Sequence, residues 1–436
     1  MSGFAHGVHP PDNKHYTEKL PIRRYPFPRR VVLPLSQHIG APSRALVAVG
    51  DRVQRGQLIA NPGGFVSTAL HASVTGTVVE IAPYRVSSGA LVPSIVIETD
   101  PFDAQRLEER PPLDPSALNN KDFVQHIQMA GIVGLGGAAF PSHVKYAVPE
   151  GKRIEHLVIN GAECEPFLTC DHRVMLESPE QVMGGIAIVA ERLGVRSTHV
   201  GIEDNKPDAV EALRRAGGGK GNIQVDALHV KYPQGAEKML IKAIHGREVP
   251  AGKLPLELGM VVNNVGTMAA IYDYFQTGKP LIERVLTVTG PGVAEPANLL
   301  VPLGTSVREI LEYCGIKPEV TQVIMGGPMM GQPLAELDVP VQKGTSGLLV
   351  LTKAGMAKEY ACIRCGRCLE ACPELLNPQL LAKLARGGRW EETESRAFVF
   401  DCIECGSCSY ACPSGIPIVQ LIKTSKAELR KRQRAK

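Results

Sequence analysis

Two copies of one cysteine pattern near the C-terminus constrain this chain more than any other feature of its 436 residues. The first copy reads CIRCGRCLEACP over residues 362–373, and the second reads CIECGSCSYACP over residues 402–413. In each copy a glycine, Gly366 or Gly406, gives the backbone room to turn and to direct N–H groups at sulfur. The proline after the fourth cysteine turns the chain in a new direction. The pattern therefore predicts two tight loops that wrap a metal centre.

The spacing C-x2-C-x2-C-x3-C-P is typical of chains that hold two [4Fe-4S] clusters, in which the fourth cysteine of each run ligates the other cluster. We therefore expect cluster 1 to be held by Cys362, Cys365, Cys368 and Cys412, and cluster 2 by Cys402, Cys405, Cys408 and Cys372. Such crossed ligation places the clusters close together, as electron relay requires. A pair of structural zinc ions is the alternative, but zinc sites usually use separated C-x2-C pairs or add histidine.

The segment between the two cysteine runs predicts helix, because Leu380, Leu381 and Leu384 fall at helical spacing before an RGG stop. Residues 353–436 are therefore expected to form an α-helical ferredoxin module with two clusters. The remaining cysteines, Cys164, Cys170 and Cys314, are interpreted as small buried hydrophobes, the common state of a lone cysteine.

The stretch from Val47 to Ile81, within a domain predicted over residues 1–115, alternates apolar positions with turn signals, as in VAVGDRVQRGQLIA and HASVTGTVVEI. These two halves resemble the barrel-sandwich hammerhead of biotinyl and lipoyl carriers. The carriers need a lysine in their central turn, and the turn here, NPGGFVST, has none. We therefore expect a structural hammerhead without a swinging arm.

Residues 116–284 alternate helical patterns with strand patterns, which predicts an α/β domain with a largely parallel sheet. One of the expected strands is DALHVKYP, residues 226–233. Residues 285–352 then change to strand, turn, strand and helix, consistent with a small β-grasp-like unit. The predicted fold class is thus a multidomain combination of α/β and β structure, with four domains in the order given.

The stretch GIVGLGGAAFPSHVKY, residues 131–146, contains a glycine-rich loop. The loop follows a helical pattern and lacks the spacing GxGxxG, so a Rossmann fingerprint is excluded. An ordinary turn at the end of a helix is the plain alternative. Three further stretches favour a binding site: LVINGAECEPF at the end of a strand, and YPQGAEKMLIKAI and MVVNNVGTMAAI at the starts of helices.

In this order, the four stretches resemble the flavin-binding 51 kDa NADH-oxidising subunit of respiratory complex I. The complete order of hammerhead, flavin domain, β-grasp and twin clusters resembles the C subunit of the Rnf ion-translocating ferredoxin:NAD oxidoreductase. This resemblance covers nearly the whole chain. It implies FMN and NAD(H) as cofactors beside the two [4Fe-4S] clusters.

The resemblance also implies roles for individual residues. The residues expected to contact cofactor are Gly134, Gly136 and Gly137 against the flavin, Lys145 at an FMN oxygen or phosphate, Asn160 at the isoalloxazine edge, and Asn263 and Asn264 near the FMN phosphate. Phe140 stacks on a ring or simply packs in the core. Glu163 and Glu165 are expected to line the nicotinamide pocket as catalytic residues, with solvated loop carboxylates as the alternative.

Two positions depart from the pattern of the family. Ala139 stands where the family usually has glycine, which is harmless at negative φ and obstructive at positive φ. Leu135 replaces an arginine of the complex I version, so one nucleotide contact is not expected.

The expected activity is electron transfer between NAD(H) and partner subunits through FMN and the clusters, in either direction. FMN matches the two-electron chemistry of NAD(H) to the one-electron chemistry of the clusters. With no apolar run long enough to span a membrane, the protein is expected to lie peripherally on the cytoplasmic face of the inner membrane. The expected partners are integral membrane and ferredoxin-like subunits. Ion movement would occur in those partners.

Two other functions are kept as alternatives. The first is a soluble flavin reductase of the cobalamin-reducing type, and the second is a cluster-bearing scaffold that never touches nucleotide. The formal charge of +4 is too slight to imply nucleic acid. Seven of the basic residues lie between Lys423 and Lys436, which predicts a solvated helix end rather than a contact with lipid or a partner.

Overall fold

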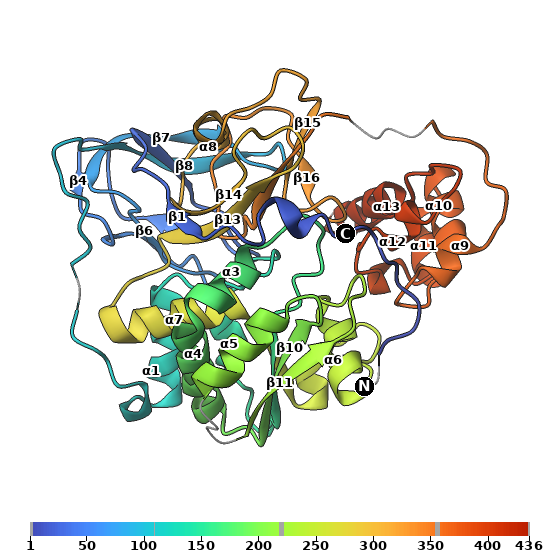
Figure 1. Ribbon diagram of the computed structural model, residues 1–436, viewed down its shortest axis with the longest axis horizontal. Coiled ribbons are helices and arrows are strands. Elements are labelled where there is room, and N and C mark those ends of the chain that lie inside the picture. The colour runs from blue at the N-terminus through green and yellow to red at the C-terminus, as the bar shows by residue number, and fades with distance from the viewer. Residues whose placement is uncertain (1–2, 109, 218–221, 354–357, 435–436) are drawn as a thin grey trace.

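The computed structural model describes residues 3–108, 110–217, 222–353 and 358–434, which fold into four modules (Figure 1). A two-sheet β module, an α/β module, a second β module and a helical module follow one another along the chain. Most of the elements that the helical and β patterns of the sequence predict are present in these modules. No helix among the described residues is both long and apolar enough to cross a membrane.

The first β module consists of two small antiparallel sheets, the hammerhead expected from the sequence. One sheet has the order β2 (Arg30–Pro34), β8 (Leu91–Thr99), β7 (Gly76–Arg85), β4 (Arg52–Val53), and the other has the order β3 (Arg44–Ala45), β5 (Leu58–Asn61), β6 (Leu70–His71). Val31 and Leu33 alternate with more exposed neighbours and are fully buried, because only one face of β2 meets the core.

The turn between β5 and β6 is bound to the α/β module. The Gln128 side chain donates to the carbonyl oxygens of Gly64, Phe65 and Ser67 at 3.0–3.2 Å. The His143 ring lies 2.7 Å from the same Phe65 carbonyl. This turn, where carrier proteins present a lysine, is therefore a fixed contact between two modules.

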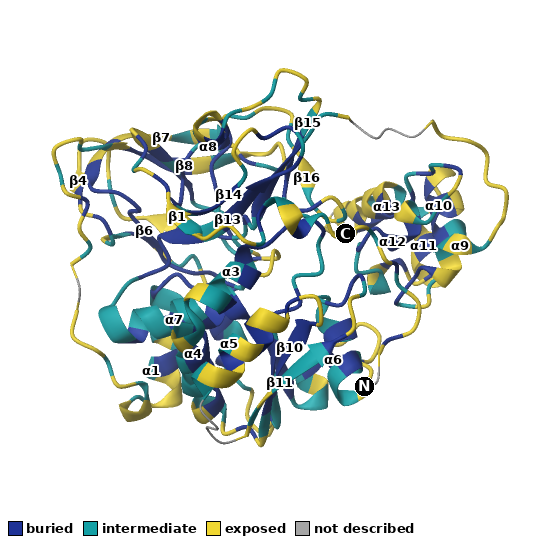
Figure 2. Cartoon of the chain, in the orientation of Figure 1, coloured by how far each residue is buried: buried dark blue, intermediate teal, exposed yellow. Residues whose placement is uncertain are grey.

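The α/β module has a four-stranded parallel sheet, as predicted. Its order is β11 (Ile223–Leu228), β10 (Ser197–Glu203), β9 (His156–Asn160), β12 (Met260–Asn264), and its helices are α1 (Asn120–Met129), α2 (Ser142–Tyr146), α3 (Cys170–Glu177), α4 (Pro179–Leu193), α5 (Pro207–Gly217), α6 (Glu237–His245) and α7 (Val265–Thr277). Leu157 and Ile159 pack with α4, α5 and α7, whereas Val158 packs with α6 on the other face. Figure 2 shows buried residues along β10, whereas the edge strand β11 is mostly of intermediate exposure.

The strand predicted over residues 226–233 is wrong in its position, because β11 spans Ile223–Leu228. The chain leaves the sheet after Leu228, and at Tyr232 its backbone pairs with Val8 of the N-terminal segment instead. A local apolar pattern cannot distinguish these two kinds of pairing.

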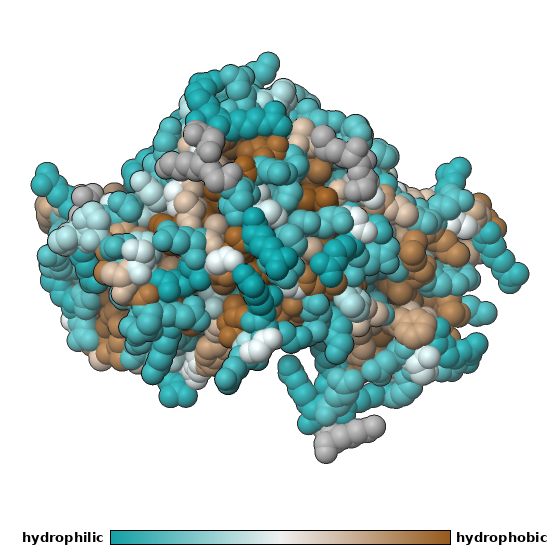
Figure 3. Space-filling view, turned by 90° about the horizontal axis from the view of Figure 1, so that it is seen from below, coloured by the Kyte–Doolittle hydropathy of each residue, from teal (hydrophilic) through white to brown (hydrophobic). Residues whose placement is uncertain are grey.

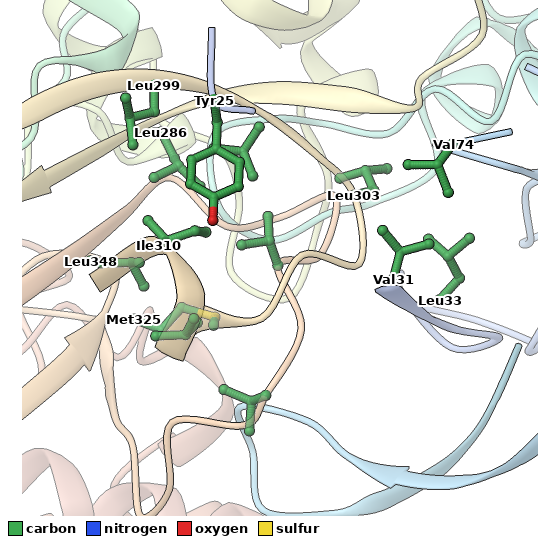
Figure 4. Close-up of a cluster of buried hydrophobic side chains, with 14 of the residues drawn as sticks. Tyr25, Val31, Leu33, Val74, Leu286, Leu299, Leu303, Ile310, Met325 and Leu348 are labelled. Atoms are coloured by element: carbon green, nitrogen blue, oxygen red, sulfur yellow. The ribbon is translucent and has the colours of Figure 1, made fainter. Parts of the chain in front are cut away.

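The second β module is a six-stranded sheet with one helix, α8 (Val307–Cys314). Its order is β1 (Ile22–Arg24), β14 (Ala297–Pro302), β13 (Glu283–Thr289), β17 (Gly347–Leu351), β15 (Gln322–Met325), β16 (Gln332–Pro333). The edge strand β1 comes from the N-terminal part of the chain. Val31 and Leu33 of the hammerhead share one core with Leu286 and Leu299 of this sheet (Figure 4). The two β modules therefore stabilise each other.

The C-terminal module lies at the right of Figure 1, and its described residues form five short to medium α-helices. They are α9 (Arg367–Glu370), α10 (Pro378–Arg386), α11 (Trp390–Ser395), α12 (Ser407–Tyr410) and α13 (Ile418–Arg434). Leu381 and Leu384 of α10 pack against Ile418 and Ile422 of α13. The last basic residues of α13 are exposed, but Lys426 is buried and donates to the Cys402 carbonyl at 2.6 Å and to Glu404 at 2.8 Å, so the solvated helix end predicted for this stretch is wrong at Lys426. Lys436 lies outside the described residues. In the view from below, hydrophobic residues also show on the surface of the molecule (Figure 3). Ile363, Leu375 and Phe398 of the C-terminal module are exposed.

Candidate functional site

A cavity of about 680 Å³ opens where the four modules meet. The α/β module contributes most of its wall through three loops, residues 135–139, 160–171 and 232–238. Gln37 and Ser87 come from the hammerhead, residues 325–332 and 342–346 from the second β module, and Ile403 from the helical module. The site is therefore an interface between modules rather than a pocket within one of them.

The glycine-rich loop forms one wall of this cavity with bare backbone. Gly136 and Gly137 line the cavity, and Gly137 has a φ of +116°, which favours glycine. A Cβ added at Gly137 would meet no atom within 4 Å, so this backbone faces open space. Gly134 and Phe140 do not line the cavity; the Gly134 N–H donates to the Phe140 carbonyl at 2.8 Å and closes the loop.

Ala139 has a φ of +49°, in the left-handed region. A glycine adopts this backbone conformation without strain, whereas the methyl group of alanine makes it unfavourable. Leu135 lines the cavity without any positive charge of its own. A guanidinium nevertheless reaches this loop from β13, since Arg284 donates to the Leu135 carbonyl at 3.3 Å and to the Lys343 carbonyl at 2.6 Å.

Asn160 and Glu163 lie at the end of β9 and in the loop that follows it, and both line the cavity. The Asn160 amide donates to the Gly235 carbonyl at 2.9 Å, joining this loop to the turn before α6. The Glu163 carboxylate accepts the backbone N–H groups of Asp171 at 2.7 Å and His172 at 3.2 Å. Glu163 thus accepts hydrogen bonds from the backbone N–H groups at the start of α3 as well as lining the cavity.

Glu165 lines the same cavity and is held from the second β module. Its carboxylate oxygens accept the backbone N–H groups of Met329 at 3.1 Å and Met330 at 2.8 Å. Burial raises the pKa of Glu165 to about 7 despite these bonds. Glu165 is therefore a carboxyl group that changes protonation near neutral pH beside the cavity.

Asn264 lines the cavity at the start of α7, and Asn263 lies just behind it. The Asn264 side chain accepts from the Gly266 N–H at 2.8 Å and donates to Asp171 at 2.7 Å. Burial, and then the neighbouring Glu163, raise the pKa of Asp171 above its ordinary value. Asn263 accepts from the Tyr146 hydroxyl at 3.1 Å, while its buried amide nitrogen has no partner among the described residues.

Lys145 lies outside the residues that line the cavity. Its ammonium donates to the Val262 carbonyl at 2.6 Å and lies 3.5 Å from Glu237, which does line the cavity. The predicted contact between Lys145 and an FMN oxygen would need this ammonium to turn toward the cavity. Its role stays a prediction.

The two cysteine loops have matching backbone conformations. Arg364 and Glu404, two residues after the first cysteine of each run, both have positive φ, 56° and 57°. The glycines that follow, Gly366 and Gly406, have φ of 78° and 81° and begin the short helices α9 and α12. The sequence repeat is therefore a structural repeat.

The thiols gather in the two predicted sets. Burial raises the pKa of Cys368, and the nearby thiols of Cys412, Cys365 and Cys362 raise it further. Burial likewise raises the pKa of Cys408, and the nearby thiols of Cys402, Cys405 and Cys372 raise it further. The second set also lines a small cavity with apolar walls. Thiols grouped by fours around a cavity fit a cubic iron–sulfur cluster, which binds thiolates and removes this mutual repulsion.

The two sets differ in depth, and one residue joins the second set to the large cavity. Cys362 and Cys365 are exposed, whereas Cys372, Cys405 and Cys408 are buried. Ile403 lines both the large cavity and the cavity of the second cysteine set. The cysteines of predicted cluster 2 therefore lie next to the candidate nucleotide site.

Sequence reasoning missed Lys14, which supports the loop after β9 from the N-terminal segment. Its buried ammonium donates to the carbonyls of Glu163 at 2.9 Å, Glu165 at 3.1 Å and Leu168 at 2.5 Å. Arg284 and Tyr232 were missed as well. All three contact residues more than 140 positions away, and no local pattern signals such a contact.

Family models match all four modules of the chain. The RnfC barrel sandwich hybrid domain matches residues 2–101, and the Nuo51 FMN-binding domain matches residues 127–273. The SLBB domain matches residues 285–333, and the 4Fe-4S dicluster domain matches residues 359–416. These matches confirm the predicted fold class and the predicted flavin and iron–sulfur cofactors.

Full-length relatives are similar over nearly the whole chain. The chain is 47% identical to the C subunit of the proton-translocating ferredoxin:NAD(+) oxidoreductase complex of Clostridium ljungdahlii, over 100% of this chain and 96% of the relative. It is 44% identical to the C subunit of the Na(+)-translocating ferredoxin:NAD(+) oxidoreductase complex of Acetobacterium woodii, over 90% and 89%. It is 43% identical to the C subunit of the ion-translocating oxidoreductase complex of Rhodobacter capsulatus, over 99% and 84%.

A solved structure shares part of the fold. The structure of an NAD+-reducing [NiFe]-hydrogenase in the air-oxidized state superposes with a TM-score of 0.50 at 18% identity. The match covers 73% of this chain and 63% of the hydrogenase chain. At this identity the likeness concerns the fold alone.

Proposed function

The chain belongs to the RnfC family, the C subunits of ion-translocating ferredoxin:NAD oxidoreductase complexes, and we propose that its large cavity binds FMN and NAD(H). The family resemblance inferred from the sequence is thereby confirmed, as are the oxidoreductase class and the membership of a complex with several subunits. The proposal concerns which residues carry the activity and in which order.

The residues around the cavity suit a flavin nucleotide. FMN, when bound, supplies the exchange between the two-electron chemistry of NAD(H) and the one-electron chemistry of the clusters. The bare backbone of Gly136 and Gly137 lets a flat ring approach closely, and Asn160 offers an amide at the edge of that ring. Asn264, at the start of α7, suits the FMN phosphate. Glu165, with a pKa near neutrality, is suited to hold or release a proton in the cavity.

One observation carries the proposed order of electron transfer. Ile403 lines both the large cavity and the cavity of the second cysteine set, whereas two cysteines of the first set are exposed. We therefore assign cluster 2, on Cys402, Cys405, Cys408 and Cys372, to the nucleotide side. Cluster 1, on Cys362, Cys365, Cys368 and Cys412, is assigned to the exit toward a partner protein.

The partners and the placement of the protein are part of the proposal. Ferredoxin-like and integral membrane subunits of the same complex would receive or deliver the electrons, and the chain would lie peripherally on the cytoplasmic face of the membrane. The four proposed domains keep the bounds 1–115, 116–284, 285–352 and 353–436, and each matched family range falls within one of them.

The test is anaerobic reconstitution of the full chain with iron, sulfide and FMN, followed by titration with NADH. We expect NADH to bleach the flavin absorbance first and the cluster absorbance after it. The matched variant Gly137→Val places a branched side chain at a positive φ in the cavity wall, and should lose FMN while it keeps both clusters.

Two results would count against the proposal. A wild-type protein that retains no flavin supports the scaffold alternative, in which nucleotide is never bound. A reconstituted protein that reduces cobalamin and does not co-purify with membrane subunits supports the soluble reductase alternative.

A further inference from the structure

Tyr232 contacts both the large cavity and the second cysteine loop. The residue belongs to the cavity lining, and its hydroxyl donates to the Cys405 backbone carbonyl at 2.7 Å. The side chain is 2% exposed. One side chain thus bridges the α/β module and the backbone of a predicted cluster ligand.

This hydrogen bond lies among buried apolar side chains. Tyr232 packs with Val8, Ala371 and Cys405 in a buried apolar group, against which Ile403 and Met329 also lie. The phenol hydroxyl is the donor in this bond, and the Cys405 carbonyl is the acceptor. A carbonyl that lost this donor in such surroundings would be buried without compensation, which drives the loop to rearrange.

The N-terminal segment holds Tyr232 from behind. Val8 and Tyr232 exchange two backbone hydrogen bonds of 2.9 Å. Beside this pair, Lys231 donates to the Phe4 carbonyl at 2.8 Å, and the His6 ring lies 2.7 Å from the Glu370 carbonyl of the helical module. We call residues 4–17, which also include Lys14, the N-terminal strap. The strap thus contacts both modules that Tyr232 bridges.

We propose that Tyr232 is a positioning residue for electron transfer, which fixes the Cys405 loop, and with it cluster 2, beside the nucleotide cavity. The strap keeps Tyr232 in place through Val8. This inference rests on the proposed function, because it concerns the passage between the same cavity and the same cysteine set. It adds that a hydrogen bond from a hydroxyl group, and not only apolar packing, holds the Cys405 loop beside the nucleotide cavity.

The test uses the full chain with both clusters and FMN, as wild type and as Tyr232→Phe, which removes only the hydroxyl. After rapid mixing with NADH, the rate of cluster reduction relative to that of flavin reduction should fall in the variant, because the Cys405 loop would move relative to the nucleotide cavity. The EPR signal of dithionite-reduced cluster 2 should change, and that of cluster 1 should not. Tyr274→Phe is the matched control. It removes the hydroxyl of a tyrosine in α7, which is hydrogen-bonded to the His126 ring at 2.9 Å.

A second variant acts through the strap alone. Val8→Pro removes the N–H that donates to the Tyr232 carbonyl and leaves every cavity-lining residue intact. It should slow cluster reduction in the same direction as Tyr232→Phe. If Tyr232→Phe does not fold, Val8→Pro carries the test.

The two proposals fail in different ways. Unchanged cluster EPR and unchanged cluster reduction in both variants would overturn the role of Tyr232. If NADH does not reduce the wild-type flavin, the proposed function fails, yet the dithionite arm still reports whether Tyr232 positions cluster 2. An effect that Tyr274→Phe reproduces would mark a general loss of stability and would also overturn the inference.

Discussion

At the level of single residues, the site contains one residue with a strained backbone and one carboxyl group with a raised pKa. Ala139 lies at positive φ in the loop that forms one cavity wall, and Glu165, which also lines the cavity, has a pKa of about 7. Neither property follows from residue type alone, because both are imposed by the surroundings. Each can be tested by one substitution.

Replacing Ala139 with glycine should stabilise the protein slightly. An alanine in the left-handed region destabilises the folded state by roughly 1–2 kcal/mol. Glycine removes this strain, but its greater conformational freedom in the unfolded chain offsets roughly 0.5–1 kcal/mol of the gain. We expect Ala139→Gly to raise the free energy of unfolding by about 0.5 kcal/mol, measured by denaturant titration. Ala138→Gly, at a residue without positive φ, should lower it instead. Equal effects of both variants would contradict the strain at Ala139.

Replacing Glu165 with glutamine should change the pH dependence of stability. The pKa of Glu165 is raised in the folded state, so its contribution is complete below the unfolded pKa and is lost as pH rises through about 7. Between about pH 5.5 and 8, wild type should lose about 2 kcal/mol relative to Glu165→Gln. Chemical unfolding across this range measures the difference. Glu180→Gln, an exposed change in α4, should show no such slope.

At the level of elements, the N-terminal strap supports the loop after β9. Lys14 places one ammonium on three carbonyls, those of Glu163, Glu165 and Leu168. Burial lowers the pKa of Lys14, while Glu163 and other nearby carboxylates act in the opposite direction. The strap is thereby a structural part of the site, although it lies far before this loop in the sequence.

Lys14→Met should loosen this loop. The substitution leaves three buried carbonyls without their donor, which costs about 3 kcal/mol or more. Hydrogen exchange of backbone amides over residues 163–169 should therefore accelerate by at least about tenfold. Lys19→Met, an exposed change just beyond the strap, should leave that exchange at the wild-type rate. Unaltered exchange in Lys14→Met would show that the loop keeps its shape without the strap.

The elements also show what could be predicted from the sequence. The cysteine loops, the parallel sheet and most helices depend on spacing and periodicity over short stretches of chain, and these predictions are confirmed. The contacts of Lys14, Tyr232 and Arg284 could not be predicted, because each joins segments that only the tertiary fold brings together. The strand placed over residues 226–233 was wrong for the same reason, since Tyr232 pairs with the strap.

At the level of the whole molecule, one carboxylate joins three parts of the chain. Glu283 of β13 binds Arg55 of the hammerhead at 2.6 Å, Arg24 of β1 at 2.9 Å and Lys279 after α7 at 2.8 Å. Burial alone would raise the pKa of Glu283, but these cations, Lys279 foremost, lower it to about 2. The network supports the same packing of modules that forms the cavity.

Glu283→Gln should therefore weaken the contact between modules. At pH 7 the variant leaves the buried Arg55 without its counter-charge, at a cost of about 3 kcal/mol in unfolding free energy. Because the folded pKa is lowered, the contribution of the carboxylate is present above the unfolded pKa and is lost as pH falls through about 2. Unfolding of wild type and variant apoprotein at about pH 7 and about pH 3 should thus show a smaller difference at the lower pH.

A control for this prediction lies on the surface of the same module. Asp338 pairs with Arg308 at 2.8 Å, and both side chains are about half exposed or more. Asp338→Asn should cost no more than about 1 kcal/mol at pH 7. If Glu283→Gln costs no more than this surface change, the network does not hold the modules together.

The position of Ile403 in the wall of the large cavity has a consequence for the biogenesis of the protein. A growing chain on the ribosome cannot complete that wall until residue 403 has emerged and the C-terminal helices have packed in place. A chain that ends before residue 403 lacks this part of the wall. The proposed nucleotide site can therefore be completed only after the earlier modules have been synthesised.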